Sequence, residues 1–376
     1  MTKDGASMGI DPEKSIPKYL QLKDSIKRHL QHGGYESDQK IPTESDLMAQ
    51  FNVSRSTVRQ ALGELVNEGV IYRKQGSGSF FSGTIQHERK PSYLIGMMIP
   101  EISSYIYPQI IRGVHEVAQQ HRYHIVLESP KTNPGKELAC IEQLLEKEID
   151  GLLLEPASGF QYTRSSDISR FLKALPIPVV FMDWAIDDPA ISYVALNDVE
   201  GGFIATRYLL EAGHKRIACI RPTDHLPGIH RYHGYRKALE ASGIAYDSRF
   251  DKPSATLTRN VPDEAYMLMK ELLDLGDDRP TAVFCFNDQT ALQGYDAIRE
   301  AGLRVPEDMS LMGFDDSELA VRMEVPLTTV IHPKYYIGKW AVEILFDKIK
   351  QQDQSFPRHL LITPKIAVRD SIKRLS

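Results

Sequence analysis

Two stretches near the N-terminus place their apolar side chains at helical spacing. The members of the two stripes are Leu47, Met48 and Phe51, then Val58, Ala61, Leu62 and Leu65. Such spacing buries one face of a helix. Thr43, with Asp46 three residues later, predicts a capping box at the first helix, and Ser54 is suited to cap the second. Gly69 fits the left-handed position that often follows a helix end. We therefore predict two short helices separated by a tight turn at Asn52.

The second helix would begin with polar side chains opposite its apolar stripe, namely Arg55, Ser56, Thr57 and Arg59. Two β-prone runs follow at residues 70–72 and 79–81, joined by a glycine-rich tip that contains Gln75, Gly76 and Ser77. An arginine on a helix in the DNA major groove can pair with guanine through two hydrogen bonds. Glycine lets the tip approach a neighbouring groove, while Lys18 and residues 73–74 suit phosphates. The pattern favours a DNA-binding module over an ordinary helical hairpin with a solvated basic face.

Beyond residue 92 the chain alternates short apolar runs with helical patterns. The apolar runs are residues 94–99, 124–127, 151–154, 178–182, 217–220, 282–286 and 310–313. The helical patterns are residues 107–121, 134–148, 199–212, 230–242, 262–275 and 288–301. Alternation of this kind is typical of parallel sheets covered by helices. Roughly 280 residues are too many for one such core, so we expect two α/β lobes that bind a ligand at the carboxyl ends of their strands.

Composition divides the chain at the same place. The 376 residues carry a net charge of −5, yet the first 90 have a slight basic excess and the remainder is acidic. Binding to DNA would then depend on a local basic patch and on a second copy of it. Residues 83–92 are polar and include Pro91, which predicts a linker. Residues 1–12 are predicted to be a loose tail.

The cysteines and the apolar runs bear on the cellular compartment. Cys140, Cys219 and Cys285 stand alone without the spacing of a metal site, so we predict buried, reduced thiols, which suit the cytoplasm. The N-terminus has no apolar core, and we expect no signal peptide. No apolar run approaches the length of a membrane span. A cytoplasmic protein with no membrane partner is the resulting expectation.

Polar and aromatic side chains follow the predicted strands. They are Ser103, Tyr105, Glu155, Asp183, Trp184, Asn287, Asp315 and His332, and Arg231 is expected at the start of a helix. The hydroxyl groups and C–H faces of a sugar call for carboxylates, an amide, an arginine and an aromatic wall. Each residue alone has an ordinary alternative as a turn or cap residue. The set as a whole favours a ligand site.

Residues 17–30, 39–62 and 65–81 closely resemble the winged helix–turn–helix of the GntR family of bacterial transcription regulators. The likeness covers nearly all of residues 16–82. It implies a set of DNA contacts, at Lys18, Glu44, Arg55, Ser56, Arg59, Gln75 and Gly76.

Residues 196–220, 231–244, 282–317 and 326–345 closely resemble the effector-binding domain of LacI-type repressors, which has the type I periplasmic sugar-binding fold. By position, this resemblance implies ligand contacts at Arg231, Asn287, Asp315 and His332. Additional contacts are implied at Glu155, Asp183 and the loop that runs through Ser103 and Tyr105 to Tyr107.

A GntR-type reader joined to a LacI-type sensor resembles the bacterial repressors of arabinose-utilisation genes. The resemblance implies L-arabinose as effector, operator DNA of arabinose genes as target, and release of the DNA when sugar binds. A different small sugar and a transcriptional activator stay open as alternatives. The helix–turn–helix and hinge helix that LacI-type repressors carry are absent here, so their route from sugar to DNA cannot be transferred.

We therefore predict an α/β protein with a winged helix–turn–helix DNA-binding domain at residues 15–82 and a linker at 83–92. A two-lobed sugar-sensing and dimerisation domain would occupy residues 93–376. A homodimer would present two readers to a pseudo-palindromic operator.

An enzyme is not expected, because the chain has no G-x-S-x-G elbow, P-loop or dinucleotide fingerprint, and no cofactor is expected either. Two histidine pairs, at residues 121 and 124 and at 230 and 233, lack a third metal ligand nearby. A transport protein would need a signal peptide and no DNA reader.

Overall fold

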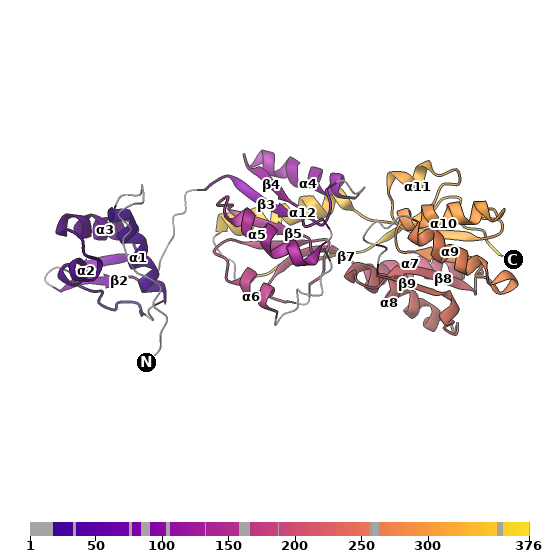
Figure 1. Ribbon diagram of the computed structural model, residues 1–376, viewed down its shortest axis with the longest axis horizontal. Coiled ribbons are helices and arrows are strands. Elements are labelled where there is room, and N and C mark those ends of the chain that lie inside the picture. Colours follow the sequence, from indigo (N-terminus) through magenta and orange to yellow (C-terminus); the bar gives the residue numbers. More distant parts are fainter. Residues whose placement is uncertain are drawn as a thin grey trace. The chain divides into compact units, whose positions relative to one another are not determined.

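The computed structural model (Figure 1) describes residues 18–32, 35–74, 77–83, 91–102, 106–131, 133–157, 166–186, 188–255, 257, 263–351 and 356–375. Contacts between residues divide the chain into two compact units, Met1–Lys90 and Pro91–Ser376. We call them the reader unit and the effector unit and describe each by itself.

The reader unit holds three helices and a hairpin. They are α1 (Lys18–His32), α2 (Glu44–Phe51) and α3 (Arg55–Asn67), followed by the antiparallel strands β1 (Ile71–Lys74) and β2 (Gly78–Phe81). The predicted capping box is confirmed: Thr43 Oγ1 accepts from the Asp46 N–H at 3.3 Å, and Asp46 Oδ2 accepts from the Thr43 N–H at 2.9 Å. Asn52 and Gly69 have φ angles of 50° and 69°, as predicted for turns after the two helices. Both predicted apolar stripes pack against α1 in one core.

Lobe 1 of the effector unit is built on a parallel sheet of order β13-β7-β6-β5-β3-β4. The strands are β3 (Leu94–Met98), β4 (His124–Glu128), β5 (Gly151–Leu154), β6 (Val179–Met182), β7 (Ser192–Leu196) and β13 (His359–Ile362). The helices are α4 (Tyr107–Gln120), α5 (Glu137–Leu145) with a preceding 3-10 turn η1 (Pro134–Lys136), α6 (Asp167–Lys173) and α12 (Lys334–Gln351). Leu153 of β5 packs with α4 and α12, whereas Leu152 and Leu154 pack with α5 and α6. Helices therefore cover both faces of the sheet, which explains the unbroken apolar run of β5.

Lobe 2 repeats this plan with the sheet order β14-β12-β11-β10-β8-β9, in which β14 alone runs antiparallel. The strands are β8 (Ile217–Pro222), β9 (Asp251–Ser254), β10 (Ala282–Cys285), β11 (Ser310–Asp315), β12 (Thr328–Ile331) and β14 (Lys365–Ala367). The helices are α7 (Asp198–Glu211), α8 (Leu226–Ala241), α9 (Glu264–Leu273), α10 (Asp288–Glu300) and α11 (Glu318–Arg322), with 3-10 turns η2 (Ser248–Phe250) and η4 (Gly276–Asp278). One core lies under α7 and α8, and another under α9 and α10.

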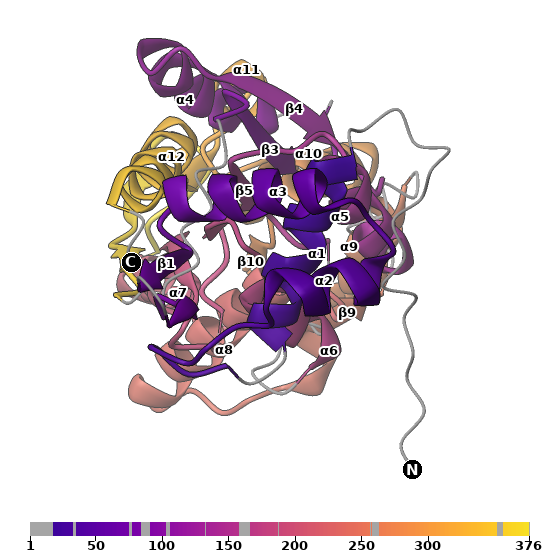
Figure 2. The same ribbon diagram turned by 90° about the vertical axis from the view of Figure 1, so that its left-hand side faces the viewer.

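The chain crosses between the lobes at three places: from β7 to α7, from β12 to α12, and from β13 to β14. As a result α12 lies beside α4 in lobe 1 although it belongs to the last part of the sequence, as both Figure 1 and Figure 2 show. Two lobes that are joined by only a few crossing segments have the geometry of a hinge.

Each predicted apolar run of the effector unit overlaps a strand, and each predicted helical pattern overlaps a helix. The predicted start of a helix at Arg231 is wrong, because α8 begins at Leu226. His225 caps the helix there and Pro227 occupies its first turn, where a missing N–H costs nothing. The three cysteines are buried and form no disulfide, as predicted.

Candidate nucleic-acid interface and ligand-binding site

α3 begins with the polar side chains that the sequence singles out. Ser54 caps the helix through its hydroxyl, which accepts from the Thr57 N–H at 3.2 Å and lies 2.9 Å from the Ser56 hydroxyl. The side chains of Arg55 and Arg59 are 71% and 65% exposed. The helix end is therefore capped and presents two solvent-facing guanidinium groups.

Glu44, the first residue of α2, lies between these two arginines. Its carboxylate is 3.3 Å from Arg55 Nε and 3.5 Å from Arg59 Nε, one oxygen to each. Both ion pairs join the Nε of an arginine to an oxygen of the same carboxylate. Glu44 thus lies within the predicted DNA-binding group, in contact with two other members of it.

The hairpin adds a small basic and aromatic surface. Tyr72 and Phe80 stack with ring centroids 5.8 Å apart, and the Lys74 ammonium lies 4.8 Å from the Phe80 ring centroid. Ser77 is exposed at the tip and its N–H donates to the Lys74 carbonyl at 2.9 Å. Lys18 is exposed at the start of α1. The predicted contacts Gln75 and Gly76 lie outside the described residues.

In the effector unit, most of the predicted ligand contacts that the structure describes gather where the two lobes meet, and Asn287 is the exception. We call this group the interlobe cluster; its members are Tyr107, Glu155, Asp183, Trp184, Asp198, His225, Arg231, Asp315 and His332. From lobe 1, the Tyr107 hydroxyl donates to Glu155 Oε1 at 2.7 Å, and Asp183 and Trp184 follow the end of β6. Ser103 and Tyr105 lie outside the described residues.

Lobe 2 contributes a buried arginine with two carboxylates. Arg231 Nε donates to Asp198 at 2.8 Å, and its Nη1 lies 3.4 Å from Asp315 and donates to the Phe286 carbonyl at 2.9 Å. The guanidinium carbon lies 3.6 Å from the centroid of the Phe314 ring. Stacking and three acceptors hold Arg231 in one orientation.

Two contacts link the lobes within this cluster. His332 Nε2 lies 2.8 Å from Asp183 Oδ1, which joins the end of β12 to the end of β6. Trp184 of lobe 1 meets His225 of lobe 2 edge-on, with ring centroids 5.4 Å apart. The cluster is therefore one continuous polar and aromatic arrangement built from both lobes.

Three polar atoms of the interlobe cluster are buried and have no hydrogen-bond partner among the residues that the structure describes. They are Glu155 Oε2, Trp184 Nε1 and His332 Nδ1. Buried polar atoms in native proteins almost always have partners, and leaving one unsatisfied costs about 1–3 kcal/mol. A carboxylate oxygen, an indole N–H and an imidazole nitrogen together suit a ligand that both donates and accepts hydrogen bonds.

Burial dominates the electrostatics of the cluster. It raises the pKa of Glu155 well above its usual value, with a further contribution from the Asp183 charge. Burial also raises the pKa of Asp198 to about 6, although Arg231 opposes this shift. His225 is affected in the opposite sense: burial, reinforced by Arg231, lowers its pKa to about 3 and keeps the imidazole neutral. The carboxyl groups outnumber the single guanidinium, so the site disfavours additional negative charge.

Asn287 has a structural task in this structure. Its side-chain oxygen accepts from the Thr290 N–H at 2.8 Å and caps α10. The next residue, Asp288, is fully buried; its two carboxylate oxygens accept from the Ser317 N–H at 2.7 Å and from the Thr329 hydroxyl at 2.6 Å. Asp288 therefore ties α10 to the segment that follows β11 and to β12.

The sequence reasoning did not select Asp198 and His225 as site residues. Asp198 begins α7 directly after β7, a strand that is absent from the predicted apolar runs. His225 precedes α8, whose start was placed five residues too late. Trp184 was noticed after its strand, but its indole N–H became informative only once its burial was known.

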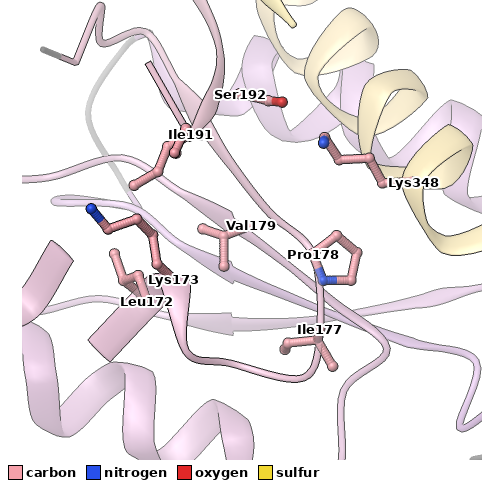
Figure 3. A pocket seen from close by; sticks show the side chains of 9 residues that line it. Leu172, Lys173, Ile177, Pro178, Val179, Ile191, Ser192 and Lys348 are labelled. Carbon is pink, nitrogen blue, oxygen red and sulfur yellow. The ribbon is translucent and has the colours of Figure 1, made fainter. Parts of the chain in front are cut away.

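A separate pocket of about 220 Å³ lies at the amino ends of β6 and β7 in lobe 1. Figure 3 shows Val179 and Ile191 between Lys173 and Lys348. The Lys173 ammonium is 2.7 Å from a carboxylate oxygen of Asp188. The interlobe cluster lies at the opposite, carboxyl ends of these strands, so the pocket is not part of it.

Within the described ranges, no group of histidine, cysteine, aspartate and glutamate side chains is arranged to hold a metal ion. Among those same residues, no helix combines the length and the apolar character needed to cross a membrane.

Comparisons with known proteins agree with this two-part organisation. Residues 18–81 match the model of the gntR family of bacterial regulatory proteins, and residues 206–372 match that of the periplasmic binding protein-like domain. An arabinose metabolism transcriptional repressor from Geobacillus stearothermophilus is 36% identical over 365 residues, which cover 96% of this chain and 100% of the relative.

Two solved structures resemble the chain. The complex of the transcriptional regulator CelR with cellobiose is 26% identical with a TM-score of 0.65, and covers 88% of this chain and 95% of its own. A LacI family transcriptional regulator from Enterococcus faecium with bound ribose is 25% identical with a TM-score of 0.64, and covers 75% of this chain and 100% of its own.

Fold, site and likeness define a DNA-binding transcriptional repressor with an effector domain. The chain belongs to the family of bacterial transcriptional repressors in which a GntR-type winged helix–turn–helix precedes a LacI-type effector domain.

Proposed function

We propose that the effector unit binds a neutral monosaccharide, L-arabinose, at the interlobe cluster and that binding releases the repressor from operator DNA of arabinose genes. The observation that carries this proposal is the set of three buried, unpartnered polar atoms on Glu155, Trp184 and His332. Adjacent sugar hydroxyls donate to the carboxylate and accept from the indole, so one small polyol satisfies atoms that otherwise remain unpaired.

The identity of the sugar rests on likeness as well as on chemistry. The relative named above is a repressor of arabinose metabolism, and both solved structures carry sugars. The surplus of carboxyl groups over the Arg231 guanidinium supports a ligand without a phosphate or carboxylate.

The proposed ligand contacts are Ser103, Tyr105, Tyr107, Glu155, Asp183, Arg231, Asn287, Asp315 and His332, with Trp184 added from the structure. The proposed DNA contacts are Lys18, Glu44, Arg55, Ser56, Thr57, Arg59, Gln75, Gly76 and Ser77. In this scheme the arginines of α3 contact bases and the hairpin tip and Lys18 contact the backbone. The protein works as a binding switch without catalysis or a cofactor.

The switch follows from differential affinity. A sugar that contacts side chains of both lobes binds one lobe arrangement better than another, and it shifts the protein toward that arrangement. A coupling free energy of about 1–3 kcal/mol between sugar and DNA is the usual range for such proteins. We propose that two effector units pair in the cytoplasm, so that a homodimer places two readers on a pseudo-palindromic operator.

Tryptophan fluorescence and calorimetry test the ligand. Both tryptophans of the chain, Trp184 and Trp340, lie in the effector unit, and only Trp184 belongs to the interlobe cluster. The protein should be titrated with L-arabinose, D-arabinose, D-ribose, D-xylose and D-galactose. Binding of L-arabinose should be saturable and should have the lowest dissociation constant of the five. The fluorescence change should disappear in Trp184→Phe and persist in Trp340→Phe. Absence of binding by every sugar in both methods would refute the proposal.

A DNA-binding titration with labelled operator tests the division of labour. Arg59→Ala should weaken operator binding and leave the sugar dissociation constant unchanged. Asp315→Ala should have the opposite effect and leave a repressor that sugar no longer releases. Equal damage to both activities by either change would contradict the assignment.

A further inference from the structure

Lys334 occupies the crossing between β12 and α12 and binds three backbone carbonyl groups. Its ammonium donates to the carbonyl oxygens of Asp315, of Asp316 at 3.0 Å, and of His332 at 3.3 Å. An ammonium has three protons, and three acceptors therefore use its full donor capacity. Its partners are main-chain atoms at the ends of β11 and β12.

The two aspartates that Lys334 binds have unusual backbone conformations. The φ angles of Asp315 and Asp316 are 101° and 50°, both in the region that normally favours glycine. Residues with side chains keep such conformations only where the surrounding structure holds them there. Lys334 contacts both carbonyl groups of this turn and is thus a source of that restraint.

The turn determines where two carboxylates lie. The Asp315 carboxylate is 3.4 Å from Arg231 Nη1 within the interlobe cluster, and the Asp316 carboxylate is 2.6 Å from Arg369 Nη2. Lys334 is also the first residue of α12, which packs in lobe 1, whereas β11 belongs to lobe 2. The Lys334 ammonium therefore connects the turn that carries Asp315, in lobe 2, to the first residue of α12, in lobe 1.

We infer that Lys334 is a positioning residue for the effector: it holds the Asp315–Asp316 turn in its ligand-binding form and transmits the state of that turn to α12. This inference rests on the proposed function of the interlobe cluster as the sugar site. Without the ammonium, the turn relaxes toward ordinary backbone angles and Asp315 leaves its place beside Arg231. Sugar affinity then falls, and the sugar-dependent release of DNA falls with it.

The test uses the full chain with Lys334→Met, which keeps an unbranched apolar stem but removes the donors. The matched control is Lys339→Met on the same helix, where the ammonium has a carboxylate partner, Glu343, at 3.9 Å. Calorimetry with L-arabinose should show at least about a ten-fold higher dissociation constant for Lys334→Met and no more than a two-fold change for Lys339→Met. Operator affinity without sugar should equal that of the wild type in both.

A double-mutant comparison separates positioning from general damage. If Lys334 acts through Asp315, then Lys334→Met should change sugar affinity less than two-fold in an Asp315→Asn background, measured by fluorescence at high sugar concentration. Lys334→Gln retains two N–H donors; it should recover part of the affinity, and it replaces Lys334→Met in the comparison if that variant does not fold. A wild type that binds no sugar would refute the sugar site itself. If the wild type binds sugar, two results would refute the role of Lys334 alone. One is an unchanged sugar affinity in Lys334→Met, and the other is a loss of affinity on adding Lys334→Met that is as large in the Asp315→Asn background as in the wild type.

Discussion

Replacing Arg231 by methionine should destabilise the effector unit strongly. Arg231 is 5% exposed, and it is the cation beside the buried carboxylates of Asp198 at 2.8 Å and Asp315 at 3.4 Å. Methionine fills much of the same volume but removes the charge. Breaking a buried ion pair by removing one partner costs about 3–5 kcal/mol, because the remaining charge stays buried without compensation. Since a domain has about 5–15 kcal/mol of stability in total, this loss is large.

The loss should depend on pH and on Asp198. Burial already raises the pKa of Asp198 to about 6 while Arg231 opposes the shift, so removing Arg231 raises that pKa further. The variant then takes up a proton near neutral pH, and its deficit relative to the wild type should be smaller at pH 6 than at pH 8. Arg231→Met with Asp198→Asn should recover at least about 1 kcal/mol, since the stranded carboxylate is gone.

Urea denaturation followed by tryptophan fluorescence measures this free energy, because both tryptophans lie in the effector unit. Arg207→Met is the control: Arg207 is 53% exposed and pairs with Glu211 at 3.5 Å, so its loss should cost less than about 1 kcal/mol. An Arg231→Met protein within 1 kcal/mol of the wild type, or a double variant no more stable than Arg231→Met, would show that the buried pair does not act as described.

Four further substitutions and one change of ligand test other parts of the molecule. Glu44→Gln should weaken operator binding at most about five-fold, because the exposed ion pairs that Glu44 makes are worth about 0.2–1 kcal/mol. Arg59→Ala should weaken operator binding more than this. Fluorescence anisotropy with labelled operator compares the two variants. Gly234→Ala would place a Cβ 2.0 Å from the Val199 carbonyl oxygen and should cost about 1–3 kcal/mol or more. By contrast, Gly63→Ala meets no atom within 4 Å and should stabilise the reader unit by up to about 1 kcal/mol; thermal melts by circular dichroism measure both. Burial raises the pKa of Asp288 from its ordinary value of 3.8 to about 7. Between these two pH values the folded state binds a proton that the unfolded state has released. The contribution of this group to the free energy of unfolding therefore falls as pH rises from about 4 to about 7. Asp288→Asn should remove that fall, measured as the difference from wild type in melts across this range. Calorimetry with L-arabinose 5-phosphate should show at least about ten-fold weaker binding than L-arabinose, because the phosphate would enter a site rich in carboxyl groups.

The reader unit was predictable because its signals are local. Capping at Thr43 and Ser54 and the left-handed turns at Asn52 and Gly69 each depend on residues within one helical turn. The buried strands of the effector unit were equally predictable, since helices on both sides demand an unbroken apolar run. In contrast, β9 contains Pro253 and forms a sheet edge, so its sequence does not resemble that of an interior strand.

The interlobe cluster was only partly predictable, because its contacts join distant positions. Residues at strand ends in parallel sheets gather at one edge, which is why Glu155, Asp183 and Asp315 could be selected from the sequence. The pairing of His332 with Asp183 spans 149 positions and joins the end of β12 in lobe 2 to the end of β6 in lobe 1. The role of Asn287 as a helix cap illustrates the limit: a strand-end amide fits a ligand contact and a cap equally well until its partner is known.

The distribution of the unpartnered atoms explains how binding could become a signal. Glu155 and Trp184 belong to lobe 1, whereas His332 follows the lobe 2 strand β12 at the crossing into α12. A ligand that satisfies all three must contact both lobes at once, so its binding free energy depends on the angle between them. A sugar that lacks the hydroxyl facing His332 would still bind lobe 1, but it would have little preference for one lobe arrangement over another. Such a sugar should compete with L-arabinose without releasing operator DNA, since a ligand shifts an equilibrium only by its difference in affinity for the two states. Under the proposed function, the three atoms would determine which sugar hydroxyls are recognised and which of those contacts change the DNA affinity of the reader unit.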